Sequence, residues 1–318
     1  EGTGSTNSLT FTPANWNQLQ TVTVTGVDDL VADGSQVYKV VTAAAASTDA
    51  NYNNLNPDDV TVTNSDNETP GITVNPTAGL TTAEAGGKAN FSVVLNTQPT
   101  ANVTVGLNSS NVKEGTVSTN SLTFTATNWN TAQQVTVTGV EDSIADGDID
   151  YKVVTAAAVS TDPNYSNRDV TDVSISNQDN DTAGVSISLT ETTATEGGAN
   201  GTYSAVLKSQ PIAPVTVNLT TDNQIQAIAP LTFTATNWSV AQTVTVKAVD
   251  DTVVEGAHSG SIAHNVTSTD TKYNGMVVPG VIVAIADNDT APTPVTTTPT
   301  PVTTTPTQVT TTTTPVTT

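Results

Sequence analysis

An internal repeat constrains this chain more than any other feature. The segment 9–16, LTFTPANW, returns as LTFTATNW at 122–129 and at 231–238, so that the three tryptophans stand 113 and 109 residues apart. An alternating Thr/Val block, a Ser-Thr-Asp-x-x-Tyr block and an acidic tripeptide follow each copy in the same order. A period of about 110 residues is too long for a solenoid repeat and has the length of one β-sandwich domain. The repeat therefore predicts a row of sandwich domains.

The repeat also places the domain boundaries. It defines unit one as residues 1–69, unit two as 70–182 and unit three as 183–290. Glu1-Gly2-Thr3 aligns with Glu114-Gly115-Thr116, which lies well inside unit two. Unit one is therefore expected to be the C-terminal part of a truncated sandwich, with a core face and sheet edges uncovered. We expect it to be loosely ordered in isolation, and the alternative is that it recruits strands from another chain.

The last segment, residues 291–318, differs from the units in composition. It consists almost only of Thr, Pro and Val and contains no aromatic or charged residue. Such a tract has little to bury, so we expect a disordered Thr/Pro-rich linker or stalk with an extended backbone.

The pattern inside the units is typical of strands. Alternating or β-branched runs bounded by Gly, Pro, Asn and Asp predict about seven strands in unit two, at 71–75, 89–96, 102–108, 121–125, 133–140, 150–157 and 170–176. A small residue recurs at Gly26, Gly139 and Ala248, as expected at a bulge or a close contact between sheets. The recurring Trp and Tyr residues are interpreted as core. The predicted fold class is all-β, a tandem array of immunoglobulin-like sandwiches.

The composition excludes several functions. With 8 Lys and Arg against 30 Asp and Glu, the net charge is −22, which argues against binding nucleic acid or an anionic membrane. No apolar run is long enough to span a membrane. The absence of Cys removes disulfides and thiolate chemistry. The two histidines, His258 and His264, form no defensible catalytic spacing, so we expect a protein that is not an enzyme.

The acidic residues gather in three places of each unit. One is a Glu before two glycines, the second is the loop after the Thr/Val block, and the third is the closing tripeptide. If these places meet at one end of a sandwich, unpaired carboxylates repel one another, and a hard divalent cation such as Ca²⁺ relieves the repulsion. No imidazole or thiol is expected near them, which disfavours Zn²⁺. The alternative is that these residues are ordinary turn formers and edge protectors.

Together the three motifs resemble the Calx-beta repeat, a seven-stranded immunoglobulin-like sandwich, in the form found in arrays of large bacterial extracellular proteins. The resemblance covers residues 1–290 and rests on a Glu-x-Gly-Gly opening, a Val-Asp-Asp loop with a later acidic residue and Gly, and a closing Asp-Asn-Asp. Calcium-binding members of that family use the same three places. The resemblance therefore implies calcium ligands at Asp28, Asp29, Asp33, Asp66, Glu68, Glu84, Glu141, Asp142, Asp146, Asp179, Asp181, Glu196, Asp250, Asp251, Glu255, Asp287 and Asp289.

Two departures from the family pattern bear on affinity. Asn67, Asn180 and Asn288 interrupt the closing acidic triplet, and Asp222 is the only candidate for the family's Asp after the third strand. The resemblance thus implies fewer sites per domain and weaker binding.

The expected function is a calcium-stiffened structural or adhesive segment of a secreted or bacterial cell-surface protein. Its expected partners are calcium and either other surface components or copies of itself. The alternatives are a carbohydrate- or protein-recognition module and a strand-exchanging assembly unit. No aromatic cluster outside the repeat positions favours recognition.

Overall fold

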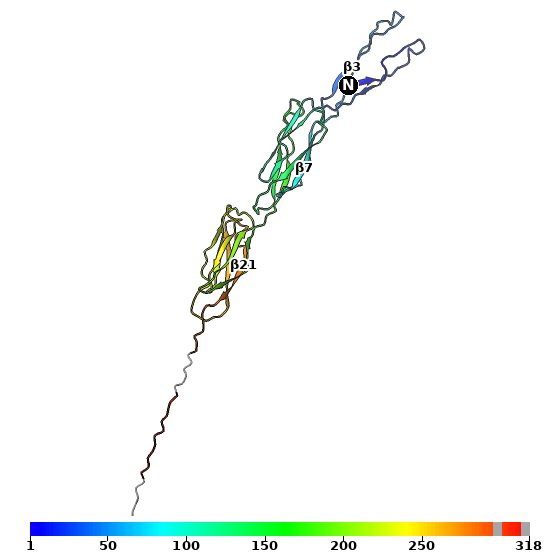
Figure 1. Cartoon of the computed structure of the whole chain (residues 1–318). Coiled ribbons are helices and arrows are strands. Elements are labelled where there is room, and N and C mark those ends of the chain that lie inside the picture. Colours follow the sequence, from blue (N-terminus) through cyan, green and yellow to red (C-terminus); the bar gives the residue numbers. More distant parts are fainter. Residues whose placement is uncertain (295–300, 313–318) are drawn as a thin grey trace, which may run out of the picture.

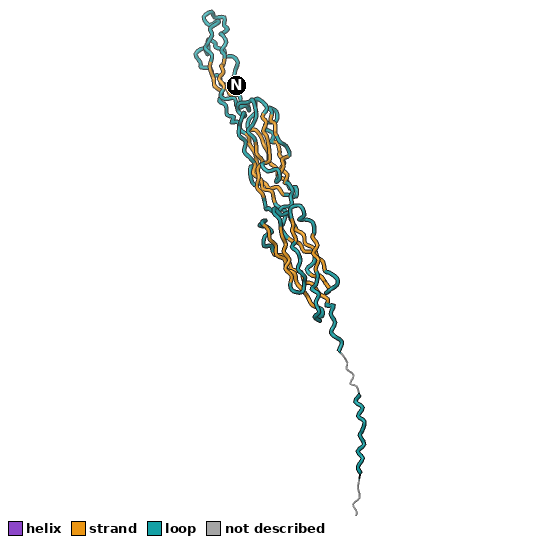
Figure 2. The backbone as a smooth tube through the Cα atoms, turned by 90° about the vertical axis from the view of Figure 1, so that its left-hand side faces the viewer, coloured by secondary structure: helices purple, strands orange, loops and turns teal. Residues whose placement is uncertain are grey.

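The computed structural model describes residues 1–294 and 301–312, and within them the chain forms strands and turns without a helix. The three units follow one another along a line (Figure 1). The view turned by 90° shows the same row of strand-rich units (Figure 2). The all-β prediction is therefore confirmed.

Unit two consists of two facing sheets. The first has the strand order β10-β8-β12-β13-β6, with bounds Ser121–Phe124, Val103–Ser109, Ile149–Thr155, Val173–Gln178 and Leu80–Ala83. The second has the order β5-β7-β11-β9, with bounds Ile72–Asn75, Lys88–Leu95, Gln133–Gly139 and Gly115–Val117. The pair β6–β13 is parallel and all other pairs are antiparallel.

Unit three repeats this arrangement, except that its smaller sheet has three strands instead of four among the described residues. Its larger sheet has the order β15-β21-β20-β17-β18, with bounds Glu191–Thr195, Val277–Ala286, His258–Ser268, Val215–Thr221 and Leu231–Phe233. Its smaller sheet has the order β14-β16-β19, with bounds Val185–Ile187, Gly201–Leu207 and Gln242–Val246. Here β15 pairs in parallel with β21, as β6 does with β13.

The alternation of apolar and polar residues along the strands produces the core. On β7, Phe91, Val93 and Leu95 are buried, since successive side chains of a strand point to opposite faces. Tyr165 and Tyr273 are the largest fully buried side chains. Trp129 and Trp238 pack, partly buried, against the cores of their units. In units two and three the aromatic residues of the repeat are thus core, as predicted.

The sequence indicated all but two of the strands of unit two. The missed strands are β6 and β9, which have four and three residues and carry little pattern of their own. The recurrent small residue at Gly139 marks a close contact between the sheets, because a Cβ there would collide with the carbonyl oxygen of Ala83 at the end of β6. This contact brings the ends of β6 and β11 together.

Unit one holds four strands, β1 (Gly2–Gly4), β2 (Val24–Gly26), β3 (Gln36–Val40) and β4 (Val60–Asn64). They form two separate pairs, β1–β2 and β3–β4, among the described residues. Phe11, Trp16 and Tyr52, whose counterparts in unit two are buried or partly buried, have exposed fractions of 56%, 68% and 61%. In the structure these aromatic side chains of unit one are therefore exposed.

In the tail, residues 291–294 and 301–312 are exposed and have no strand or helix. The remainder of the predicted linker, residues 295–300 and 313–318, lies outside the described residues.

Candidate metal centre

The parallel strand pair positions the first acidic residue of each complete unit. The amide of Glu84 donates to the carbonyl of Gln178 at 3.1 Å, and the amide of Glu196 donates to the carbonyl of Ala286 at 3.1 Å. Each bond extends the parallel ladder by one residue, so the Glu lies beside the residue at which the closing tripeptide begins. Both side chains are only 2% exposed. Gly86, with a φ of 79°, then turns the chain back into β7.

The loop after β11, and its counterparts in the other units, begins with an Asp that caps its own turn. Asp142 Oδ1 accepts from the amide of Ile144 at 2.7 Å, and Asp251 Oδ1 accepts from Val253 at 2.7 Å. In unit one, Asp29 Oδ1 accepts from the amide of Val31 at 2.9 Å. One carboxylate oxygen of each residue is thus engaged by the backbone, which fixes the direction of the carboxylate.

The first Asp of each closing tripeptide ties that loop to the last strand. Asp66, Asp179 and Asp287 accept from the amides of Gly34, Gly147 and Gly256 at 2.6, 2.6 and 2.7 Å. Backbone hydrogen bonds lower the pKa of Asp66 and of Asp287. In this position the turn-forming role of the carboxylates is directly visible.

The Asn in the middle of the tripeptide satisfies two of the predicted ligands. The amide group of Asn180 donates from Nδ2 to Glu141 Oε2 at 3.1 Å, and its backbone amide donates to Glu84 Oε2 at 3.1 Å. In unit three, Asn288 Nδ2 donates to Asp250 Oδ1 at 3.0 Å. The middle residue of the tripeptide is therefore not a third carboxylate but a neutral amide, which donates a hydrogen bond to Glu141 in unit two and to Asp250 in unit three.

The structure brings most of the predicted ligands into compact groups. In each group, one ligand atom from every member lies within 4.8 Å of the others; the groups are Glu1–Asp29–Asp33, Glu84–Asp179–Asp181, Glu114–Asp142–Asp146, Glu196–Asp251–Asp289 and Glu196–Glu255–His258. The predicted residues that belong to none of these groups are Asp28, Asp66, Glu68, Glu141, Asp250 and Asp287. Asp222 accepts from Ser261 on β20 and likewise stands outside them.

The electrostatics of these groups are those of uncompensated carboxylates. Burial, followed by the charges of Asp142, Asp179 and Asp181, raises the pKa of Glu84 to about 7. Burial and neighbouring carboxylates also raise the pKa of Asp146, Asp181, Glu196 and Asp289. Within the described chain, Asp181 Oδ2, Glu196 Oε2 and Asp289 Oδ2 are buried without a hydrogen-bond partner.

Three members of the groups, Glu1, Glu114 and His258, were not predicted as ligands. Glu114 is only 6% exposed and joins Asp142 and Asp146, as Glu1 joins the loop of unit one. The Glu-Gly-Thr sequence, which occurs at residues 1–3 and again at 114–116, is the signal that could have indicated both residues. The carbonyls of Glu1, Glu114 and Gln224 accept equivalent bonds from Val27, Val140 and Val249, so Gln224 takes this place in unit three.

The third unpredicted member, His258, corrects an expectation. No imidazole was expected near the carboxylates, but His258 Nε2 lies 3.4 Å from Glu196 Oε1 and 3.4 Å from Glu255 Oε2. His258 is the first residue of β20. It is far from Glu196 in the sequence, so the sequence did not indicate that the two residues meet. The parallel β15–β21 pair brings the two together. The argument against a nitrogen ligand therefore fails in unit three.

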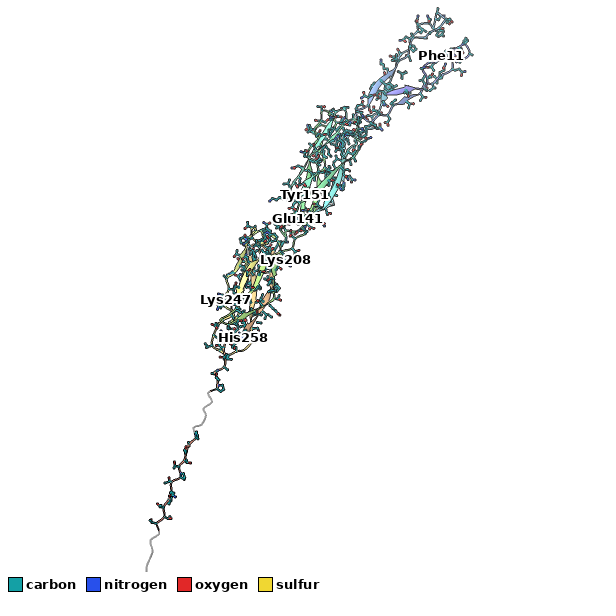
Figure 3. The ribbon with its side chains drawn as sticks, viewed as in Figure 1. Phe11, Glu141, Tyr151, Lys208, Lys247 and His258 are labelled. Carbon is teal, nitrogen blue, oxygen red and sulfur yellow. The ribbon has the colours of Figure 1, made fainter. Side chains whose placement is uncertain are left out.

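The acidic loop of one unit also contacts the next unit. The amide of Gln98 donates to the carbonyl of Leu30 at 2.8 Å, and the amide of Gln210 donates to the carbonyl of Ser143 at 2.6 Å. Figure 3 shows Glu141 at the end of unit two that faces unit three, and His258 at the opposite end of unit three. The carboxylate groups of units one and two therefore lie next to the junctions.

No family model and no curated protein matches the chain. Solved structures with similarity to it include the calcium-binding domain CBD12 of CALX1.1, at 13% identity and a TM-score of 0.33 over 68% of this chain and 99% of that one. The apo form of the Calx CBD1 domain shows 18% identity and a TM-score of 0.26 over 33% and 98%. The periplasmic chaperone SfaE shows 8% identity and a TM-score of 0.26 over 68% and 100%. At these scores, the likeness assigns no function.

Among the residues with described positions, there is no helix of a length and hydrophobicity that could cross a membrane.

Proposed function

We propose that this chain is a calcium-binding structural segment, a row of Calx-beta-like sandwich units in a secreted or cell-surface protein. Calcium occupies the carboxylate groups at the strand ends and holds each acidic loop in the geometry that contacts the next unit. The role is mechanical and adhesive, and it involves no catalysis.

The observation that supports this proposal is a set of carboxylate groups, with a buried Glu in each group of units two and three, that no Lys or Arg side chain neutralises. Over the described part of the chain, no Lys or Arg nitrogen lies within 4.0 Å of a carboxylate oxygen of these groups. Lys39 forms an ion pair with Asp59 at 3.9 Å, and Asp59 belongs to none of the groups. Unpaired buried carboxylates are costly, and each needs a counter-charge. Carboxylate oxygens together with backbone carbonyls form the ligand set that suits Ca²⁺.

The repetition of this arrangement in successive units supports a structural role. The same Asx turn and the same tie between loop and closing strand occur in all three units. An enzyme site is not expected to be copied at each domain end, whereas a ligand that stiffens an array is useful at every one. Because the loop carbonyls of Leu30 and Ser143 accept bonds from the next unit, an ordered loop means an ordered junction.

Calcium titration by calorimetry on the whole chain tests the proposal. We expect binding that is weakened by Asp142→Asn combined with Asp181→Asn, because each of the two groups in unit two loses a charge. Asp150→Asn is the matched control, since Asp150 is an exposed residue of β12 outside the groups. Calcium at about 100-fold above its dissociation constant should add about 2.7 kcal/mol per site to the free energy of unfolding.

Magnesium provides the selectivity control. It demands a small octahedral site and gives up its water reluctantly, so it should restore the stability of chelator-treated protein poorly. Melting curves that are identical with chelator and with millimolar calcium would contradict the proposal and leave the turn-forming role as the explanation of the acidic loops.

A further inference from the structure

Unit three differs from unit two at two positions of its acidic centre. His258 opens β20 opposite Ile285, and the corresponding residue of unit two, Ile149, opens β12 opposite Asn177. The apolar residue of unit two is thus replaced by an imidazole that reaches Glu196 and Glu255. At the second position, the neutral Gln224 of unit three takes the place of Glu114. Unit three has exchanged a carboxylate for an imidazole.

The imidazole of His258 is held in one tautomer. Its Nδ1 lies 2.9 Å from the carbonyl oxygen of Gly256, and a carbonyl can only accept, so Nδ1 carries the hydrogen. In the neutral ring, Nε2 therefore presents a lone pair. This lone pair faces the oxygens of two carboxylates at 3.4 Å. Three electron-rich atoms directed at one another require a positive charge, which is either a proton on Nε2 or a metal ion.

Two buried atoms without a hydrogen-bond partner indicate that the site is preformed for a ligand. Glu196 is 2% exposed, and its Oε2 has no hydrogen-bond partner in the described part of the chain. His258 Nε2 is also buried and makes no hydrogen bond to any described residue. A bond from the other ring nitrogen to a backbone carbonyl is the usual outer support of a metal-binding histidine. Gln224 Nε2, at 3.5 Å from Glu255 Oε1, supports the second ligand.

We propose that unit three binds a divalent transition metal of the zinc class through His258 Nε2, Glu196 and Glu255. This inference deepens the proposed function, because Glu196 is also a member of the all-carboxylate group Glu196–Asp251–Asp289. An imidazole with two carboxylates, leaving a further position open, is a ligand set that Zn²⁺ accepts, whereas Ca²⁺ is bound by oxygen alone. Unit two, with Ile149 at this position, lacks the nitrogen ligand.

Zinc titration of the whole chain, in competition with a chromophoric chelator, tests this site. We expect one zinc equivalent, bound at least about tenfold more weakly by the His258→Gln variant, since even the loss of an outer-shell partner costs 10–100-fold. His264→Gln is the matched control: His264 lies on the same strand, but its ring contacts Tyr203 and Pro279 and belongs to no carboxylate group. Equal zinc affinity of wild type and His258→Gln would overturn the proposal.

A measurement on the unaltered protein removes the dependence on folding of the variant. The chain has two histidines, so their ring nitrogens can be assigned by NMR. Zinc should move the Nε2 resonance of His258 and leave that of His264 in place. An imidazolium at His258 that persists in excess zinc would overturn the proposal, because a proton would then be the cation between the carboxylates.

Calcium calorimetry separates this inference from the proposed function. Calcium binding that survives in a protein without a zinc site at His258 contradicts the zinc inference alone. A zinc site in a protein that shows no calcium response contradicts the proposed calcium function alone.

Discussion

The amide of Gln210 in unit three donates a hydrogen bond to the carbonyl of Ser143 in unit two at 2.6 Å, across the junction of the two units. The previous junction repeats this bond between Gln98 and Leu30 at 2.8 Å. The accepting residue in each case lies between the Asx-turn aspartate of the acidic loop and the last acidic residue of that loop. A cation bound by the loop therefore acts next to the contact between units.

This arrangement predicts that calcium narrows the range of orientations between units two and three. The Asp142→Asn, Asp146→Asn double variant should lose the effect, because both residues belong to the group beside the junction. Small-angle scattering with and without calcium measures the change in shape distribution. Asp150→Asn should behave as wild type, and a wild-type scattering profile unaffected by calcium would argue against coupling of the loop to the junction.

The buried tyrosine next to the junction should contribute to stability independently of calcium. Tyr273 Oη donates to the carbonyl of Ser209 at 2.6 Å and lies 2.8 Å from its hydroxyl. Tyr273→Phe leaves these buried groups unpaired and should lower the free energy of unfolding of unit three by about 1–3 kcal/mol. Hydrogen exchange resolved by unit measures it.

The matched control is Tyr52→Phe, since Tyr52 occupies the same repeat position and is 61% exposed. This variant should change stability little. An equal loss of stability in both variants would mean that the Tyr273 hydroxyl does not act through its buried hydrogen bonds to Ser209.

Glu84 predicts a dependence of stability on pH in chelator. Its pKa is raised from 4.5 to about 7, first by burial, so the folded state holds this proton more tightly than the unfolded state. Its contribution to stability is then full below pH 4.5 and is lost as the pH rises to about 7. Urea unfolding between pH 5 and 7 should show this fall, and Glu84→Gln should reduce it.

Calcium should reverse the sign of this dependence, because a metal binds the ionised carboxylate. Asp150→Asn in chelator should follow the wild-type profile. If Glu84→Gln and wild type lose stability equally over this pH range, the fall does not arise from Glu84.

Unit one should be the least protected part of the row. Its strands form two-stranded pairs, whereas β11 of unit two is paired on both sides, with β7 and β9. Amides of residues 21–27 should therefore exchange much faster than those of residues 135–140. Dilute samples checked for mass by light scattering provide the measurement.

Equal protection of the two segments in a proven monomer would contradict this account of unit one. Equal protection that appears only in oligomers would instead favour strand exchange between chains through the open edges of β2 and β3.

The sequence predicted the architecture because the signals were local and repeated. Alternation located β7 and β11, and the recurring small residue at Gly139 identified a close contact that the structure places against Ala83. β6 was missed because it is defined by its parallel pairing with β13, a partner about a hundred residues away. Long-range pairing leaves almost no trace in four residues.

The same distinction applies to the site. Glu84 and Asp181 stand in two different motifs, and they lie in one group in the structure, whereas Asp142 lies in a second group with Glu114. Glu114 stands in the repeated Glu-Gly-Thr sequence, which was used only to align the units, and His258 occurs in one unit only, so repetition could not reveal it. Asn180 was interpreted as a weakening of the site; the structure shows what it does, because its side chain binds Glu141.

The most direct test of the central claim is a crystal structure of the chain grown with calcium, with anomalous scattering used to locate the ion. The account predicts anomalous peaks about 2.3–2.6 Å from oxygens of Glu84 and Asp181 in unit two, and of Glu196 and Asp289 in unit three. Carboxylates that contact only protein and water at saturating calcium would contradict it.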